Sequence, residues 1–246
     1  MSSTETPVIH EDVPVRPAST VVLLRDSEEG LQTLMLRRNK ALIFAGGAWV
    51  FPGGALEPAD YTAGPDDVET AARQAAAREA EEESALKPAP ERMVQLSHWT
   101  TPVGEPKRFS TWIYAAPVDS DDDVVIDGSE IHDSNWLNIR EAARRHEAGE
   151  MNMLPPTYIT LCNLARYETV DDVIETERQT PIPEVFPRFT VDGDQVVVLF
   201  RGDAGYASGD ATLPGARHRA GLVDGCWSYA YEGVDAEYAP LMPLES

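Results

Sequence analysis

Short runs of aliphatic residues, each bounded by polar or turn-forming residues, recur along the chain. Two of them, Ser19–Leu24 and Leu31–Arg37, are separated by the polar stretch Asp26–Gly30, and this arrangement predicts a β-hairpin. Similar runs predict a pair of strands and one later strand, at Met93–Thr100, Arg108–Val118 and Ile131–Leu137. Strands that alternate with helical segments favour an α/β (α+β) fold built around one mixed sheet.

An alanine-rich segment between these strands predicts a long helix over Asp66–Leu86. Pro65 is expected at its first helical position, and the acidic residues that follow suit the positive end of the helix. Lys87–Pro88 marks its end. The apolar face is a thin stripe of alanines, which lets the helix lie close to a sheet: Ala72, Ala75, Ala76 and Ala80. Two further helices are predicted, at Asn138–Gly149 and Pro155–Tyr167.

Composition along the chain indicates three parts. Residues 1–16 are polar and proline-bearing, and we expect a flexible lead-in. Residues 17–180 carry the strands and helices above and form the main domain. Residues 181–246 form a C-terminal extension packed on the core, with short β-like runs that include Val196–Phe200 and Cys226–Tyr231. Three roles are open for this extension: to cover the substrate, to form a homodimer interface, or to cap the core.

Net charge narrows the classes of partner. The chain has 246 residues and a formal net charge of −22. Nucleic-acid binding needs a positive surface that displaces counterions, so this class is excluded. No apolar run approaches the ~18 residues of a membrane-spanning helix. Cys162 and Cys226 have neither disulfide-framework nor zinc-ligand spacing, and we expect a cytoplasmic protein with reduced thiols.

The chemistry is suggested by carboxylates at the end of the long predicted helix. Glu79, Glu82 and Glu83 stand at i, i+3 and i+4, so they share one face of adjacent turns. Like charges at this spacing repel, whereas a hard cation such as Mg²⁺ or Mn²⁺ prefers carboxylate oxygens and substrate phosphates. The turn Phe51–Gly54 brings glycine backbone close to a ligand. The pattern predicts a metal-dependent phosphate site; the alternative is a solvated acidic helix face.

The segment from Gly54 to Leu86 resembles the Nudix box, G-x5-E-x7-R-E-U-x-E-E-x-G-U, where U is aliphatic. Arg78-Glu79 match R-E, Glu82-Glu83 match E-E, and Leu86 matches the final U. The sequence also departs from the box at several positions: Ala85 replaces its Gly, Thr70 stands where its first Glu is expected with Glu69 one residue early, and its opening Gly falls by spacing on Gly64. Because the Phe-Pro-Gly-Gly context ends at Gly54, we interpret residues Glu57–Pro65 as an insertion.

A finer resemblance concerns the coenzyme A-cleaving members of the family. Arg37-Arg38, Phe44, Gly46-Gly47 and Phe51–Gly54 resemble the signature that precedes the box in those enzymes. Three downstream segments resemble the type-nineteen branch of Nudix hydrolases: Trp99–Pro102, Lys107–Thr111 and Leu154–Thr157. The resemblance implies an α/β/α sandwich and Mg²⁺-dependent hydrolysis of the diphosphate of CoA or acyl-CoA.

The resemblance also implies roles for individual residues. Metal ligands are expected among Glu79, Glu82, Glu83 and the backbone of Gly54, and Arg78 would orient the glutamates by ion pairing, or form an ordinary surface pair. The general base would be a box glutamate, Glu82 or Glu83, or the distant Glu130, whose alternative is an exposed loop residue. Candidates for binding substrate phosphates are Arg38, Lys107 and Arg108.

Two other functions remain open from the sequence. The first is hydrolysis of another nucleoside-diphosphate-linked substrate, such as ADP-ribose, NADH or a dinucleotide. The second is a non-catalytic sensor of a nucleotide derivative, which would be expected to lose glutamates of the R-E-x-x-E-E core. This chain retains all three glutamates, which favours the enzyme.

Overall fold

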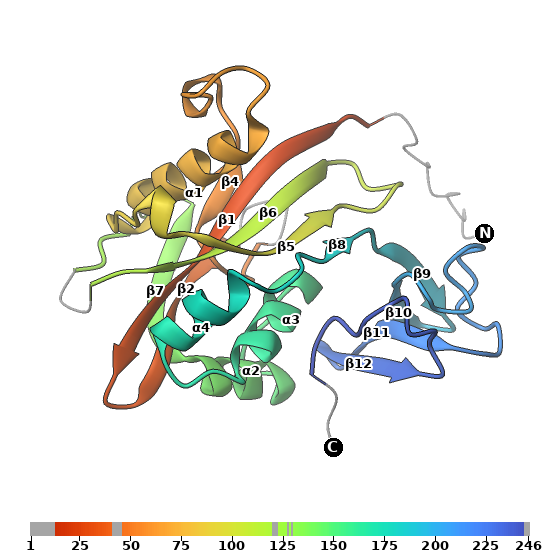
Figure 1. The fold of residues 1–246 in the computed structure, drawn as a ribbon. Coiled ribbons are helices and arrows are strands. Elements are labelled where there is room, and N and C mark those ends of the chain that lie inside the picture. Colours follow the sequence, from red (N-terminus) through yellow and green to blue (C-terminus); the bar gives the residue numbers. More distant parts are fainter. Residues whose placement is uncertain (1–12, 41–45, 120–122, 127, 129, 244–246) are drawn as a thin grey trace, which may run out of the picture.

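The computed structural model describes residues 13–40, 46–119, 123–126, 128 and 130–243. Phe44 and residues 1–12 of the expected lead-in lie outside this part of the chain. The main sheet has eight strands in the order β3-β2-β1-β6-β5-β8, with β4 paired to β1 and β7 paired to β2. Helices cover both of its faces, and a second, four-stranded sheet lies at one end (Figure 1).

The predicted hairpin is the centre of the main sheet. β1 (Val15–Ser27) pairs antiparallel with β2 (Gly30–Arg38) and parallel with β6 (Arg108–Pro117). Alternate residues of β1 point to opposite faces. Val21 and Leu23 pack under one helix, whereas Val22 and Leu24 join the larger core on the other face. β1 begins at Val15, two residues inside the segment that the sequence assigned to the lead-in.

The other strands complete the mixed sheet that the sequence predicted. β5 (Val94–Thr100) pairs antiparallel with β6, and β7 (Ile131–Asn138) pairs with β2. Two short strands lie in the glycine-rich segment: β3 (Trp49–Val50) precedes Phe51-Pro52, and β4 (Gly53–Ala55) contains both glycines. β8 (Glu184–Val185) pairs parallel with β5 at the sheet edge. The expected α/β fold is therefore confirmed.

The long helix α1 (Val68–Ser84) lies on one face of the sheet, on its alanine stripe. It starts later than predicted, because the carboxylate of Asp67 caps it by accepting a hydrogen bond from the Thr70 N–H; Pro65 lies outside the helix. Ala85 ends it in the left-handed conformation, with φ of 63°. Ala85 thus adopts a left-handed conformation that glycine, the residue of the box at this position, adopts at a lower steric cost.

The inserted loop contains a short 3-10 helix, η1 (Pro58–Asp60), and a second one, η2 (Pro90–Arg92), precedes β5. In η1, the backbone N–H of Glu57 donates to the Asp60 carboxylate at 2.7 Å. η1 therefore ends on a buried acidic side chain within the insertion.

Three helices cover the opposite face. α2 (Ile139–Glu147) and α3 (Pro155–Leu164) were predicted, although each ends two or three residues earlier than expected. α4 (Val170–Glu177) was missed, although Thr169 and Asp172 form a capping box that can be seen in the sequence. No helix among the described residues is long and apolar enough to cross a bilayer.

The C-terminal extension forms the second sheet, with the antiparallel order β12-β11-β10-β9. Its strands are β9 (Arg188–Asp192), β10 (Gln195–Leu199), β11 (Arg217–Val223) and β12 (Cys226–Glu232). Trp227 of β12 is buried, and its indole N–H donates to the carbonyl of Met153 at 3.0 Å. Trp227 therefore belongs to the same hydrophobic core as the main domain.

Candidate active site

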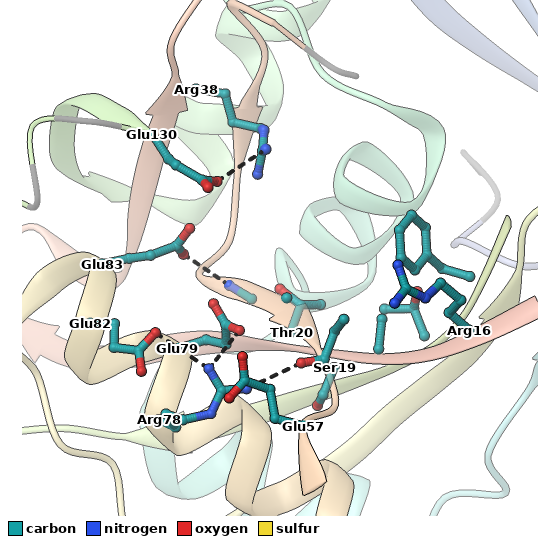
Figure 2. A pocket seen from close by; sticks show the side chains of 16 residues that line it. Arg16, Ser19, Thr20, Arg38, Glu57, Arg78, Glu79, Glu82, Glu83 and Glu130 are labelled. Carbon is teal, nitrogen blue, oxygen red and sulfur yellow. Dashed lines mark hydrogen bonds and ion pairs between the residues drawn. The ribbon is translucent and has the colours of Figure 1, made fainter. Parts of the chain in front are cut away.

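The carboxylates of α1 face the glycine turn across a cleft of about 600 Å³. Figure 2 shows Glu79, Glu82 and Glu83 projecting from the helix, with Arg38 and Glu130 on the other side of the opening. Most of the site residues expected from the sequence therefore line one cavity. Its lining comprises Arg16, Ala18, Ser19, Thr20, Arg38, Gly53, Gly54, Ala55, Glu57, Arg78, Glu79, Glu82, Glu83, Phe109, Thr111 and Glu130.

Two glycines let the backbone approach both β1 and the helix. β4 pairs with β1 in the register Ser19↔Gly54 and Thr20↔Gly53, and the Thr20 hydroxyl donates to the Pro52 carbonyl at 2.6 Å. A Cβ atom at residue 53 would overlap the backbone of β1, and one at residue 54 would overlap the Glu79 carboxylate. Position 53 therefore requires glycine, and a side chain at position 54 would displace the Glu79 carboxylate.

Arg78 joins the helix to the insertion. Its Nε and Nη2 atoms donate to the two oxygens of Asp60, each at 3.1 Å, and Nη2 also donates to the Ala55 carbonyl at 3.1 Å. Its Nη1 donates to Glu79 at 2.8 Å and to Glu82 at 3.3 Å. The hydrogen bond with Asp60 is the main cause that raises the Arg78 pKa, while partial burial opposes it. Arg78 thus touches Glu82, as expected, but its bidentate partner is Asp60.

Glu83 is the most buried of the three helix carboxylates, with 8% of its surface exposed. It accepts the Gly53 N–H at 3.0 Å. Burial outweighs that hydrogen bond and raises the pKa of Glu83 to about 8. Burial also raises the pKa of Glu79, although Arg78 opposes the shift. Two carboxylates are therefore held where their negative charge is poorly compensated by the protein itself.

This electrostatic deficit fits a bound divalent cation. Carboxylate oxygens are the ligands that Mg²⁺ and Mn²⁺ prefer, and the space left by Gly54 admits the Glu79 carboxylate beside the backbone. Among the described residues, no group of three or more acidic, His or Cys side chains is already gathered as a ligand set. The reason is visible at Arg78, which draws Glu79 and Glu82 to itself while Glu83 turns to Gly53.

The predicted phosphate-binding residues are placed differently from one another. Arg38 lines the cavity and forms an ion pair with Glu130 at 3.5 Å. Lys107 and Arg108 do not line it; Arg108 Nε instead donates to the carbonyls of Thr101 and Pro102, and so holds the β5–β6 turn.

Sequence reasoning missed two residues of the site. Arg16 lines the cavity beside Phe109, its partner across β1 and β6, but lies in the stretch that was assigned to the lead-in. Asp60 is the bidentate partner of Arg78, but it lies in the insertion, to which no role was given. Residues 15–24 show no polar–apolar alternation and Pro17 interrupts them, so no local signal places Arg16 in a strand, and none pairs Asp60 with Arg78.

A second compartment of about 400 Å³ adjoins the acidic cleft. The two share the lining residues Thr20, Arg38, Gly53, Phe109 and Thr111. The segments Trp99–Pro102 and Leu154–Thr157, which are far apart in the sequence, both line this second compartment. Its walls are mainly apolar, in contrast to the charged walls of the cleft.

Comparisons with known proteins agree with this architecture. The family model described as NUDIX domain matches residues 14–156. A NUDIX hydrolase from Alicyclobacillus acidocaldarius is similar in structure, with a TM-score of 0.60 and 22% identity over 69% of this chain and 100% of that one. The NUDIX domain of Shewanella oneidensis NrtR, crystallised with ADP-ribose, gives a TM-score of 0.46 and 17% identity over 60% of this chain and 84% of that one. Comparison with curated proteins gave no match.

The family match spans more than half of the chain and includes the strand, the turn and the helix that form the acidic cleft. The Alicyclobacillus acidocaldarius structure agrees in fold, and the three glutamates of the box are in place on α1. The chain therefore belongs to the Nudix family, and it is a diphosphate hydrolase.

Proposed function

We propose that this enzyme hydrolyses the diphosphate of CoA or an acyl-CoA, with Mg²⁺ or Mn²⁺, to 3′,5′-ADP and 4′-phosphopantetheine or its acyl derivative. The observation that carries the proposal is the apolar compartment that opens directly from the acidic cleft. A substrate that has a diphosphate at one point and a long, weakly polar arm beyond it matches both compartments. The segments that resemble the CoA-cleaving branch line the apolar one.

The residues of the cleft divide into three tasks. Glu79, Glu82 and Glu83, with the backbone of Gly54, would hold the cation. The cation, when bound, neutralises phosphate charge and lowers the pKa of a bound water. Arg38 and Arg16 line the same cavity as the carboxylates, and guanidinium groups suit phosphate oxygens through paired hydrogen bonds.

Glu130 is the proposed acceptor of the proton from the attacking water. Its side chain is 61% exposed and lies across the cleft from α1, so water reaches it. The box carboxylates are held by other partners, since Glu79 and Glu82 pair with Arg78 and Glu83 accepts from Gly53. Arg38 keeps Glu130 beside the phosphate-binding side of the cleft. Glu130→Gln should then lower kcat while KM changes little.

Product analysis by chromatography tests the proposal. The protein is incubated with Mg²⁺ and CoA, an acyl-CoA, ADP-ribose or NADH. Release of 3′,5′-ADP together with phosphopantetheine supports it and identifies the bond that is cleaved. Turnover of ADP-ribose or NADH alone would keep diphosphate hydrolysis and refute the CoA assignment.

Absence of turnover with every substrate would favour the sensor instead. A titration of melting temperature with Mg²⁺ separates these cases, because a ligand that binds only the folded protein stabilises it as its concentration rises. The enzyme requires an increase that is lost in Glu82→Gln. A sensor without the cation site would give no change.

A further inference from the structure

The apolar compartment has a wall that does not belong to the matched Nudix region. Pro187, Phe189 and Val198 line it, and all three come from the C-terminal extension. They face Trp99, Phe109 and the Leu154–Thr157 segment of the main domain. Without the extension the compartment would be an open groove on the sheet edge.

The extension is held firmly enough to act as a wall. β8 continues the main sheet by pairing beside Trp99, in the register Trp99↔Val185, and Phe200 packs edge-on against Trp99 with 6.0 Å between ring centroids. On the other side, the backbone N–H of Trp227 donates to His146 Nε2 at 2.9 Å. Buried side chains of both sheets belong to one continuous core. The wall is therefore preformed and needs no closure to exist.

We infer that the C-terminal extension is the specificity element of this enzyme: with Phe189 at its edge, it selects substrates whose diphosphate carries an apolar, uncharged arm. The inference rests on the proposed function of the adjoining cleft as a diphosphate site. The sequence left three roles open for the extension, and the inference selects the first of them, which is to cover the substrate.

Volume and charge define the arm that fits. About 400 Å³ lies within the range of roughly 300–1,000 Å³ that ligand sites occupy. The charged residues that line the compartment are Arg38, at the boundary with the cleft, and Glu105. Arg38 therefore belongs to the diphosphate end, whereas Glu105 repels an arm that ends in a carboxylate. The preferred arm is apolar and neutral at its tip.

Straight-chain alkyl esters of ADP, on the terminal phosphate, provide the test. Each candidate substrate contains an adenosine diphosphate, so these esters do not presuppose CoA. One water adds across the P–O–P bridge and gives AMP and the alkyl phosphate, which are counted directly. The value of kcat/KM should rise with chain length by about fourfold for each methylene removed from water, until the compartment is filled.

Phe189→Asp is the decisive variant, and Val191→Asp is its matched control. Both positions are on β9 and exposed, at 44% and 63%, but only Phe189 lines the compartment. Equal melting temperatures establish that both variants fold. Phe189→Asp should flatten the dependence on chain length, and Val191→Asp should keep the wild-type slope.

Each outcome decides the inference. A slope that Phe189→Asp removes and Val191→Asp keeps supports it. Turnover without any dependence on chain length, or an equal slope in both variants, would overturn it and leave the diphosphate hydrolase intact. No turnover of any ester, with the cation titration also flat, would remove the proposed function and the inference together.

Discussion

The ion pair between Asp60 and Arg78 offers the sharpest test of how the acidic cleft is built. Asp60 is buried and accepts two hydrogen bonds from Arg78, both at 3.1 Å. Asp60→Asn keeps the side-chain shape, but it removes the charge and leaves one oxygen for three donors, the two of Arg78 and the Glu57 backbone N–H. A lost hydrogen bond to a charged group costs about 1.5–3 kcal/mol, and breaking a fully buried pair about 3–5 kcal/mol. Because Arg78 is partly exposed and retains Glu79 and Glu82, we expect a loss of about 2 kcal/mol.

The same change should also weaken cation binding. Without the charge of Asp60, the Arg78 guanidinium is left to Glu79 and Glu82, and so competes more strongly for two of the expected ligands. The assays are urea denaturation at pH 7 without metal, and titration of melting temperature with Mg²⁺. Asp60→Asn should lower the unfolding midpoint and require more Mg²⁺ for half of the stabilisation.

Glu69→Gln is the matched control for Asp60→Asn. It is also a carboxylate-to-amide change in a pair with an arginine of α1, since Glu69 lies 3.0 Å from Arg73, but the pair is exposed. Such a pair contributes about 0.3–0.5 kcal/mol. If Asp60→Asn cost no more than Glu69→Gln, the insertion would not anchor Arg78. If it cost stability but left the Mg²⁺ midpoint unchanged, the anchor would be separate from the cation site.

Three further predictions concern the cleft and the histidines. Glu82→Gln should fold normally, because that side chain is exposed, and lower kcat by about 100-fold or more through loss of a metal ligand; near-native turnover in Mg²⁺ would refute the assignment. Arg38→Ala should lower kcat/KM by about 10-fold to 100-fold, whereas Lys107→Ala, outside the cavity, should change it by less than about twofold; equal effects would contradict the placement. Burial lowers the pKa values of His146 and His218 below 6.5. As pH falls through 6.5, these imidazoles take up protons in the unfolded chain but stay neutral in the folded protein, and this difference destabilises the fold. Lowering the pH from 7 to 5 should therefore lower the urea midpoint of the wild type relative to that of His146→Gln, because the raised pKa of Glu83 acts equally in both proteins; identical pH dependences would refute this role of His146.

The central elements could be predicted from the sequence because each carries a local signal. The hairpin around Gly30 is defined by two aliphatic runs and a polar turn, and α1 by its alanine stripe. The carboxylates of α1 share one face because helix geometry alone requires it. The boundaries were not predicted: Asp67 caps α1 by accepting from the backbone N–H and the hydroxyl of Thr70, and α3 ends at Leu164, three residues before the expected end.

The remainder of the site depends on contacts between distant parts of the chain. Arg16 reaches the cleft because β1 pairs in parallel with β6, which follows it by about ninety residues and sets the register Arg16↔Phe109. Arg108, which was predicted with Lys107 to bind phosphate, instead donates to the carbonyls of Thr101 and Pro102. Sequence spacing cannot distinguish the two roles, because a guanidinium donates equally well to phosphate oxygens and to the backbone carbonyls of a turn.

The two parts of the chain that the box pattern does not contain complete opposite sides of the site. The insertion supplies Asp60, which fixes the arginine behind the carboxylates, and the extension supplies Phe189, which borders the apolar compartment. In the proposed function, the glutamates of α1 and the backbone of Gly54 would hold the cation whatever the substrate. Selection among substrates requires contacts with the part that does not react, and such contacts come from added segments. A change in the extension should therefore alter which diphosphate is cleaved, while a change in the insertion should alter how well any is cleaved.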